Sequence, residues 1–174
     1  MEDAFWKELI ALSSERVLAR NEFLLTEGKV EQHCYIIRSG AVRVFLQTEF
    51  EEMTIRFGYE GSLITSLSSF INGTPSEFYI QAIRATTLEV ISKEQFNAFV
   101  SRSEAHLQWY ISLLKGLVTQ QMEREIDLLT FSPSERLQRV LERSPLVFQH
   151  IPSKYIASYL RMTPETLSRI RKEL

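Results

Sequence analysis

Residues 151–174 have the sequence IPSKYIASYLRMTPETLSRIRKEL, which divides into two short helices. Thr163-Pro164-Glu165 supply an N-cap hydroxyl, a proline suited to the first helical position and an acid for the first turn. The second helix therefore begins here. The first is expected to run from 152 to 160, which leaves only a short turn between them.

Apolar residues in this stretch have the spacing of a helix-turn-helix, in which two helices pack closely across a short turn. Ala157 falls where the helices approach so closely that only a small side chain fits. Arg161 stands in the turn where glycine is usual, so we expect a left-handed backbone there at some energetic cost. The positions predicted to face inward are Ile156, Leu160, Met162, Leu167, Ile170 and Leu174.

The opposite face of the second helix carries Glu165, Ser168, Arg169 and Lys172. Arginine can donate two hydrogen bonds to guanine and glutamate can accept one from cytosine, so we expect Glu165 and Arg169 to contact DNA bases. Phosphate contacts fix the register of a protein on DNA without specifying sequence. The side chains expected to make them are Ser153, Lys154, Arg161, Thr163, Arg171 and Lys172.

Charge is distributed unevenly along the chain. Residues 152–174 carry five basic and two acidic side chains, whereas residues 1–103 carry ten basic and fourteen acidic ones. A basic segment behind an acidic body suits contact with a polyanion, because neutralised phosphates supply the sequence-independent part of nucleic-acid affinity. The alternative is an ordinary solvated helix.

The N-terminal part alternates between helical and extended patterns. We expect helices over 3–12 and 93–102. Between them lie short runs rich in β-branched and aromatic residues, separated by turn signals that include Gly40, Gly58 and Gly61. This spacing predicts an antiparallel, jelly-roll-like β-barrel and hence an α+β fold. The runs are FLLT at 23–26, CYIIRSG at 34–40, AVRVFLQ at 41–47, MTIRFG at 53–58, FYIQAIR at 78–84 and TTLEVIS at 86–92.

A long helix is predicted over 104–129. Its N-terminal half is apolar on more than one face, so it should contact both its own barrel and a second copy of the chain. A helix buried in a single larger core is the alternative. The predicted dimer stripe is Leu107, Ile111, Leu114, Val118, Met122, Ile126 and Leu129, whereas Trp109, Tyr110, Leu113 and Leu117 lie off it.

Ser132-Pro133-Ser134-Glu135 has the form of a helix start, with Ser132 as N-cap and Glu135 placed to complete a capping box. We expect this helix to end at Ser144-Pro145. The chain then divides into a sensor barrel at 1–103, a dimerisation helix at 104–131 and a helix-turn-helix domain at 132–174.

Several classes of site are disfavoured. One cysteine, Cys34, and three scattered histidines, His33, His106 and His150, do not have the spacing of a metal site, and no cofactor is expected. A haem held by His33 or Cys34 is the alternative to two ordinary strand residues. No nucleotide-binding loop, nucleophile elbow or zinc-protease motif is present, so an enzyme is not expected. Without a signal peptide or an apolar span, we expect the cytoplasm.

The order of these elements resembles the CRP/FNR superfamily of regulators. The resemblance rests on TEG at 26–28, YIIRSGAVRV at 35–44 and TPETLSRIRKEL at 163–174. It implies an effector-sensing barrel, a dimerisation helix and a winged helix-turn-helix that binds a palindromic operator, with double-stranded DNA, a second copy and RNA polymerase as partners. The family's base-contacting Glu and Arg match Glu165 and Arg169. An Arg often found before that Glu is replaced by Pro164. Because residues 1–174 stop with the second helix, we expect no C-terminal wing within them.

The effector site departs from that family. Gly61 is kept, but Ser62 stands where the family has Glu, and Ser76-Glu77 stands where it has Arg-Ser to hold a cyclic phosphate. We therefore expect no binding of cyclic AMP or cyclic GMP, because a phosphate is costly to desolvate without a fixed cation. Phe70, Phe78 and Tyr79 are expected to fill the pocket mouth instead.

The barrel is then a scaffold or takes an uncharged ligand, so a small-molecule effector, if there is one, is unidentified. The alternative function is a ligand-binding or protein-interaction module whose helix-turn-helix no longer contacts DNA.

Overall fold

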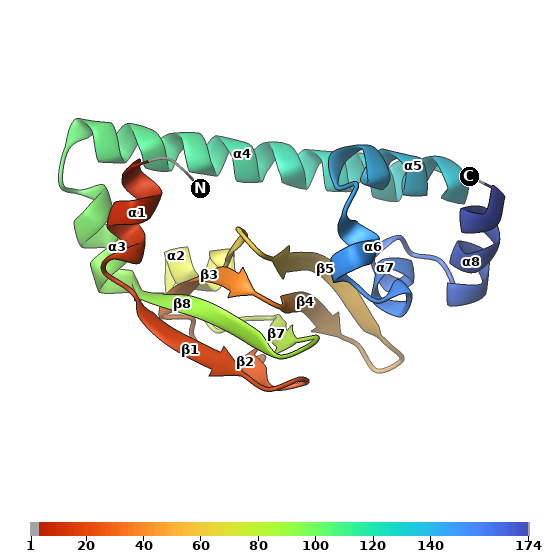
Figure 1. Ribbon diagram of the computed structural model, residues 1–174, viewed down its shortest axis with the longest axis horizontal. Helices are drawn as coiled ribbons and strands as arrows, with labels where there is room; N and C mark the ends of the chain where they lie inside the picture. Colours follow the sequence, from red (N-terminus) through yellow and green to blue (C-terminus); the bar gives the residue numbers. More distant parts are fainter. Residues whose placement is uncertain (1–3, 174) are drawn as a thin grey trace.

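The computed structural model describes residues 4–173 and shows two antiparallel β-sheets with helices along one side and at one end (Figure 1). Strand order is β1-β8-β3-β6 in the first sheet and β2-β7-β4-β5 in the second. The predicted α+β class and antiparallel sheets are confirmed. The strands are β1 (Ser14–Leu18), β2 (Phe23–Leu25), β3 (His33–Ser39), β4 (Ala41–Gln47), β5 (Glu52–Tyr59), β6 (Leu63–Ile64), β7 (Tyr79–Ala82) and β8 (Thr86–Ser92).

Strand β3 is buried on both faces. Successive side chains of a strand point to opposite sides, so Tyr35 and Ile37 enter the space between the sheets while Cys34 and Ile36 face the helices. The space between the sheets is packed with apolar side chains from both of them. The barrel therefore has a filled interior and a separate outer core beneath its helical cover.

Two glycines explain local features of the sheets. Gly40 forms the β3–β4 turn at φ +90°, where an added Cβ would lie 2.4 Å from the carbonyl oxygen of Ala85. Gly58, expected in a turn, lies inside β5 instead. An added Cβ there would be 2.4 Å from the side chain of Ile64, so this glycine allows close approach of a neighbouring strand rather than a change of direction.

The helical cover packs on the outer face of the first sheet. It consists of α1 (Ala4–Ile10), α3 (Lys93–Val100) and the first half of α4 (Glu104–Leu129), whose bounds match the prediction. Trp109 of α4 meets Trp6 and Phe99 edge-on, with ring centroids 5.2 and 5.5 Å away. Aromatic edge-to-face packing therefore anchors α4 to the barrel.

The C-terminal helices lie beside the far half of α4 and the end of β5 (Figure 1). They are α5 (Pro133–Arg143), α6 (Val147–His150), α7 (Ser153–Tyr159) and α8 (Pro164–Glu173). Ser132 caps α5 by accepting a hydrogen bond from the backbone of Glu135, and α5 ends before Ser144 as expected. Their shared core also includes Ala41 and Ile83 of the barrel.

Four short elements have no counterpart in the sequence prediction: β1, β6, α6 and α2 (Leu67–Asn72). Across residues 4–173, no helix is both long and apolar enough to cross a membrane.

Candidate functional site

The turn between α7 and α8 has the predicted strained backbone. Arg161 adopts φ 54°, in the left-handed region, and the amide of Met162 donates to the carbonyl of Ala157 at 3.1 Å. Thr163 then caps α8, because its hydroxyl accepts from the amide of Thr166 at 3.2 Å. Local chemistry thus stops one helix and starts the next within four residues.

The inner faces of α7 and α8 pack as the spacing predicts. Ala157 is fully buried at the crossing of the two helices, and Met162 is half-buried. Leu174, expected on the same face, lies outside the described residues. The other inward positions, all buried, are Ile156, Leu160, Leu167 and Ile170.

The outer face of α8 is exposed at all four predicted positions: Glu165, Ser168, Arg169 and Lys172. Within residues 4–173, neither Arg169 nor Lys172 takes part in an ion pair. The pKa of the Glu165 carboxyl is lowered by a hydrogen bond from its own backbone amide and by a second from the side chain of Thr163. The helix therefore presents free cations and an ionised hydrogen-bond acceptor to solvent.

The residues expected to contact phosphate surround this face. Ser153, Arg161 and Thr163 are exposed. Lys154 and Arg171 are also exposed, but their charged groups lie over the rings of Tyr155 and Phe148, 4.6 and 4.1 Å from the centroids. These two cations are held on aromatic surfaces.

Helix α7 is docked on strand β5 through contacts that the sequence did not indicate. The hydroxyl of Ser158 donates to the carbonyl of Glu52 and accepts from the amide of Thr54, both at 3.0 Å. The Arg43 guanidinium lies between the rings of Phe45 and Tyr155. Partners more than 100 residues apart leave no periodic signal in a sequence.

A charged clamp joins α4 to α5. Asp127 is completely buried and pairs with both Arg139 and Arg143 of α5. Its oxygen lies 2.9 Å from Nε of Arg139, which also reaches Glu123 at 2.7 Å. The same hydrogen bonding with Asp127 raises the pKa of Arg143. Ion pairs therefore connect the long helix directly to α5.

The side of α4 that faces away from the barrel is apolar and uncovered. Of the predicted stripe, Ile111 and Leu114 are half-buried. The exposed fraction is 59% at Val118 and 80% at Leu129. Leu107, Met122 and Ile126 are also exposed. The four residues predicted off the stripe, Trp109, Tyr110, Leu113 and Leu117, are all partly buried.

The four residues of the expected effector cassette are distributed over two places. Ser76 is buried, and its hydroxyl lies 2.8 Å from that of Ser66. Ser66 was not among the residues predicted from the sequence. Gly61 and Ser62 instead form the β5–β6 turn, where Ser62 accepts from the amide of Tyr59. Glu77 is exposed. The hydrogen-bonded side chains of Ser66 and Ser76 thus lie next to the start of α2.

The three aromatic residues expected at the pocket mouth also separate. Phe78 packs against the barrel interior. Phe70 lies in the outer core against Phe96, and Tyr79 stacks on Phe45, so for these two the expectation is wrong. Phe78, just before β7, and Tyr79, its first residue, therefore lie on opposite sides of the second sheet.

The residues weighed as metal ligands do not gather. In the described part of the chain, no three His, Cys, Asp or Glu side chains are placed to hold a metal ion. Burial, and then the nearby Glu31 carboxylate, raise the pKa of the Cys34 thiol to about 12. Cys34 is thus a protonated core residue at neutral pH.

Comparison with known proteins agrees with this architecture. Residues 15–103 match the family model described as the cyclic nucleotide-binding domain. No curated protein sequence matches the chain. The fold is that of FixK2 from Bradyrhizobium japonicum, with a TM-score of 0.80 and 16% identity over 93% of this chain and 84% of that one.

Two further solved structures share the fold. The c-di-GMP responsive global regulator CLP of Xanthomonas campestris has a TM-score of 0.70 at 16% identity, covering 98% of this chain and 91% of its own. The catabolite activator protein of Thermus thermophilus has a TM-score of 0.61 at 19% identity, covering 100% and 84%. At these identities the likeness concerns the fold.

Proposed function

The chain belongs to the cyclic nucleotide-binding domain family, with the fold of CRP/FNR-type regulators, and we propose that it is a dimeric, DNA-binding transcription regulator. One observation carries the proposal: α8 exposes Glu165, Ser168, Arg169 and Lys172 on one face while its other face is locked against α7. An exposed recognition helix with arginine and an ionised glutamate matches the hydrogen-bonding groups of the major groove.

We propose that the operator is an inverted repeat. A two-fold dimer through α4 presents two copies of α8, which enter successive major grooves about 34 Å apart. The uncovered apolar stripe of α4 supports this arrangement, because a monomer would leave it in water. RNA polymerase is a further expected partner, and the cytoplasm the expected location.

The test is selection of bound DNA from a random pool by the full chain, followed by affinity measurements at several salt concentrations. We expect an inverted repeat to be enriched and the affinity for random DNA to fall steeply with salt. If no DNA is retained at low salt, the proposal is wrong. The chain is then a ligand-binding or protein-interaction module with a degenerate helix-turn-helix.

For the barrel, we propose that neither cyclic AMP nor cyclic GMP is the effector. Ser76, which stands where the family has its phosphate-holding arginine, is neutral and hydrogen-bonds to Ser66, so it supplies no cation for a cyclic phosphate. The space between the sheets is also filled by apolar side chains. Calorimetric titration with both nucleotides tests this, and saturable binding below roughly 10 µM, about 7 kcal/mol, would contradict it.

A further inference from the structure

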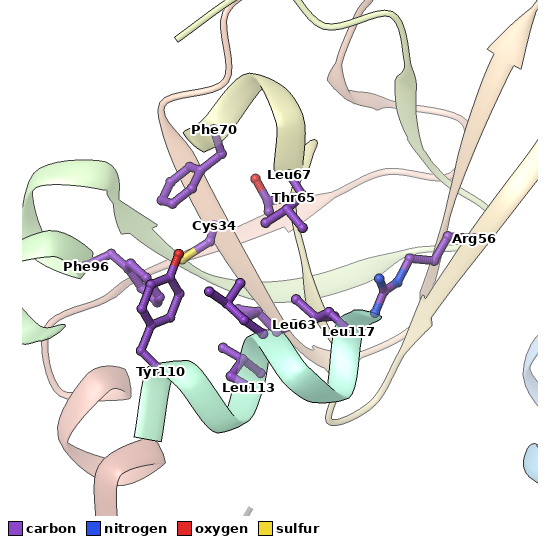
Figure 2. Close-up of a pocket in the computed structure, with 11 residues that line it drawn as sticks. Cys34, Arg56, Leu63, Thr65, Leu67, Phe70, Phe96, Tyr110, Leu113 and Leu117 are labelled. Carbon is purple, nitrogen blue, oxygen red and sulfur yellow. The ribbon is translucent and has the colours of Figure 1, made fainter. Parts of the chain in front are cut away.

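Two adjoining hollows lie outside the barrel interior, between the barrel, α4 and the C-terminal helices. The first is a narrow apolar slot of about 40 Å³ next to Cys34 (Figure 2). The second is a wider cavity of about 490 Å³ beyond it. Four residues line both hollows: Arg56, Leu63, Leu113 and Leu117.

Arg56 stands at the junction of the hollows, at one end of the row of apolar side chains in Figure 2. Within residues 4–173, its guanidinium donates one hydrogen bond, to the side-chain oxygen of Gln120 at 3.2 Å. No ion pair in residues 4–173 includes it, and burial lowers its pKa. Because arginine stays protonated in proteins, the half-buried positive charge of Arg56 has no counter-ion among residues 4–173.

The other residues that line the two hollows determine which kind of ligand could bind beside Arg56. Leu63, Leu113 and Phe96 give the slot an apolar lining. Arg143, a second cation of the wider cavity, is already paired with Asp127. The site therefore offers one unpaired guanidinium at the mouth of a thin apolar slot.

We propose that these hollows bind a small amphipathic anion, a carboxylic acid with a thin apolar body. The carboxylate accepts two hydrogen bonds from the Arg56 guanidinium, which supplies the missing counter-ion. The apolar body enters the slot between the sheet and α4. Because Leu113 and Leu117 of α4 line both hollows, the ligand would contact the barrel and the long helix at once.

Calorimetric titration of the full chain with octanoate tests the proposal, with octan-1-ol as the uncharged analogue. We expect saturable binding of octanoate and at least tenfold weaker binding of octan-1-ol, as loss of one charge-assisted contact predicts. Arg56→Gln should weaken octanoate at least tenfold. The matched control is Arg38→Gln, which removes an exposed, Glu89-paired cation from the same barrel and should change the affinity less than twofold.

A second variant tests the slot. Leu67→Phe adds bulk at its rim and should weaken octanoate while thermal unfolding shows an intact fold. The proposal is overturned if octanoate does not saturate, if octan-1-ol binds as tightly, or if Arg56→Gln and Arg38→Gln have equal effects. The comparison of octanoate with octan-1-ol needs only the unmodified protein, so it decides even where a variant fails to fold.

Discussion

At the scale of single residues, four charged side chains are buried among residues 4–173, and their surroundings differ. Arg43 pairs with Glu52. Asp127 is paired with two arginines, and Arg124 lies over the ring of Tyr159 at 3.8 Å. Glu31 has hydrogen bonds only to one oxygen, from the amide of His33 and the hydroxyl of Tyr35. Its other oxygen is buried with no partner. Burial alone therefore does not determine which of these charges stabilises the fold.

Glu31 should make stability depend on pH. Burial raises the pKa of its carboxyl above the ordinary 4.5, so the folded state holds this proton more tightly than the unfolded state. The protonated carboxyl therefore contributes to the free energy of unfolding. This contribution is complete below pH 4.5 and is lost as the pH rises through the folded-state pKa. Glu31→Gln removes it, so in urea unfolding the variant should gain stability relative to the wild type from pH 4.5 to 7.5. Parallel pH profiles would contradict this.

Arg169 and Lys172 should affect DNA binding differently. Arg169→Ala should cost roughly 1 to 3 kcal/mol on the selected operator and relax its sequence preference, because a base contact is lost. Lys172→Ala should weaken specific and random DNA similarly and flatten the salt slope, because a phosphate contact is lost. Fluorescence anisotropy with both DNAs at several salt concentrations measures the two effects. If both variants change the ratio of operator affinity to random-DNA affinity by the same factor, the assigned roles are wrong.

At the scale of elements, the turn between α7 and α8 stores strain at Arg161. A non-glycine residue costs about 1 to 2 kcal/mol in the left-handed region, and glycine avoids this cost. Glycine also makes the unfolded chain more flexible, which offsets about 0.5 to 1 kcal/mol of that gain. Arg161→Gly should therefore stabilise the fold by about 0.5 to 1 kcal/mol in urea unfolding. Arg161→Ala keeps the strain and is the control; if it stabilises equally, strain is not the cause.

The clamp between α4 and α5 should be a major contributor to stability. Asp127→Asn leaves Arg139 and Arg143 without their buried carboxylate, which should cost about 3 kcal/mol. Glu123 pairs with the same arginines but is 38% exposed, so Glu123→Gln should cost no more than about 1 kcal/mol. Chemical unfolding of both variants gives the comparison. Similar losses would mean that the buried pair contributes no more than a surface pair.

How far the sequence predicts an element depends on where its information lies. Helices α4 and α8 follow from local signals, periodic apolar residues and the cap at Thr163, and even the strain at Arg161 was predictable from the missing glycine. Strand β1 has only one buried residue, Leu18, so its pattern is weak. The pairing of Ser66 with Ser76 and the docking of Ser158 on β5 depend on tertiary contacts, which spacing does not encode.

At the scale of the whole molecule, α4 separates two environments. One face lies against the barrel through Trp109 and Leu113, and the other exposes Val118 and Met122. The helix itself runs along one side of the molecule (Figure 1). Since its own barrel covers only the first face, the second is expected to be covered by the same helix of another copy. In the proposed dimer, the position of α8 at the end of the molecule would fix the separation of the two proposed recognition helices.

The dimer should dissociate when charge is placed on that outer face. Val118→Glu puts a carboxylate in the centre of the stripe, where burial in a symmetric interface would bring two like charges together. Light scattering at micromolar concentration should give the mass of a dimer for the wild type and of a monomer for the variant. Ser112→Glu, an exposed position between the two faces of α4, is the control and should leave the dimer intact. A monomeric wild type, or equal dissociation in both variants, would remove α4 as the dimerisation element, and with it the spacing expected between operator half-sites.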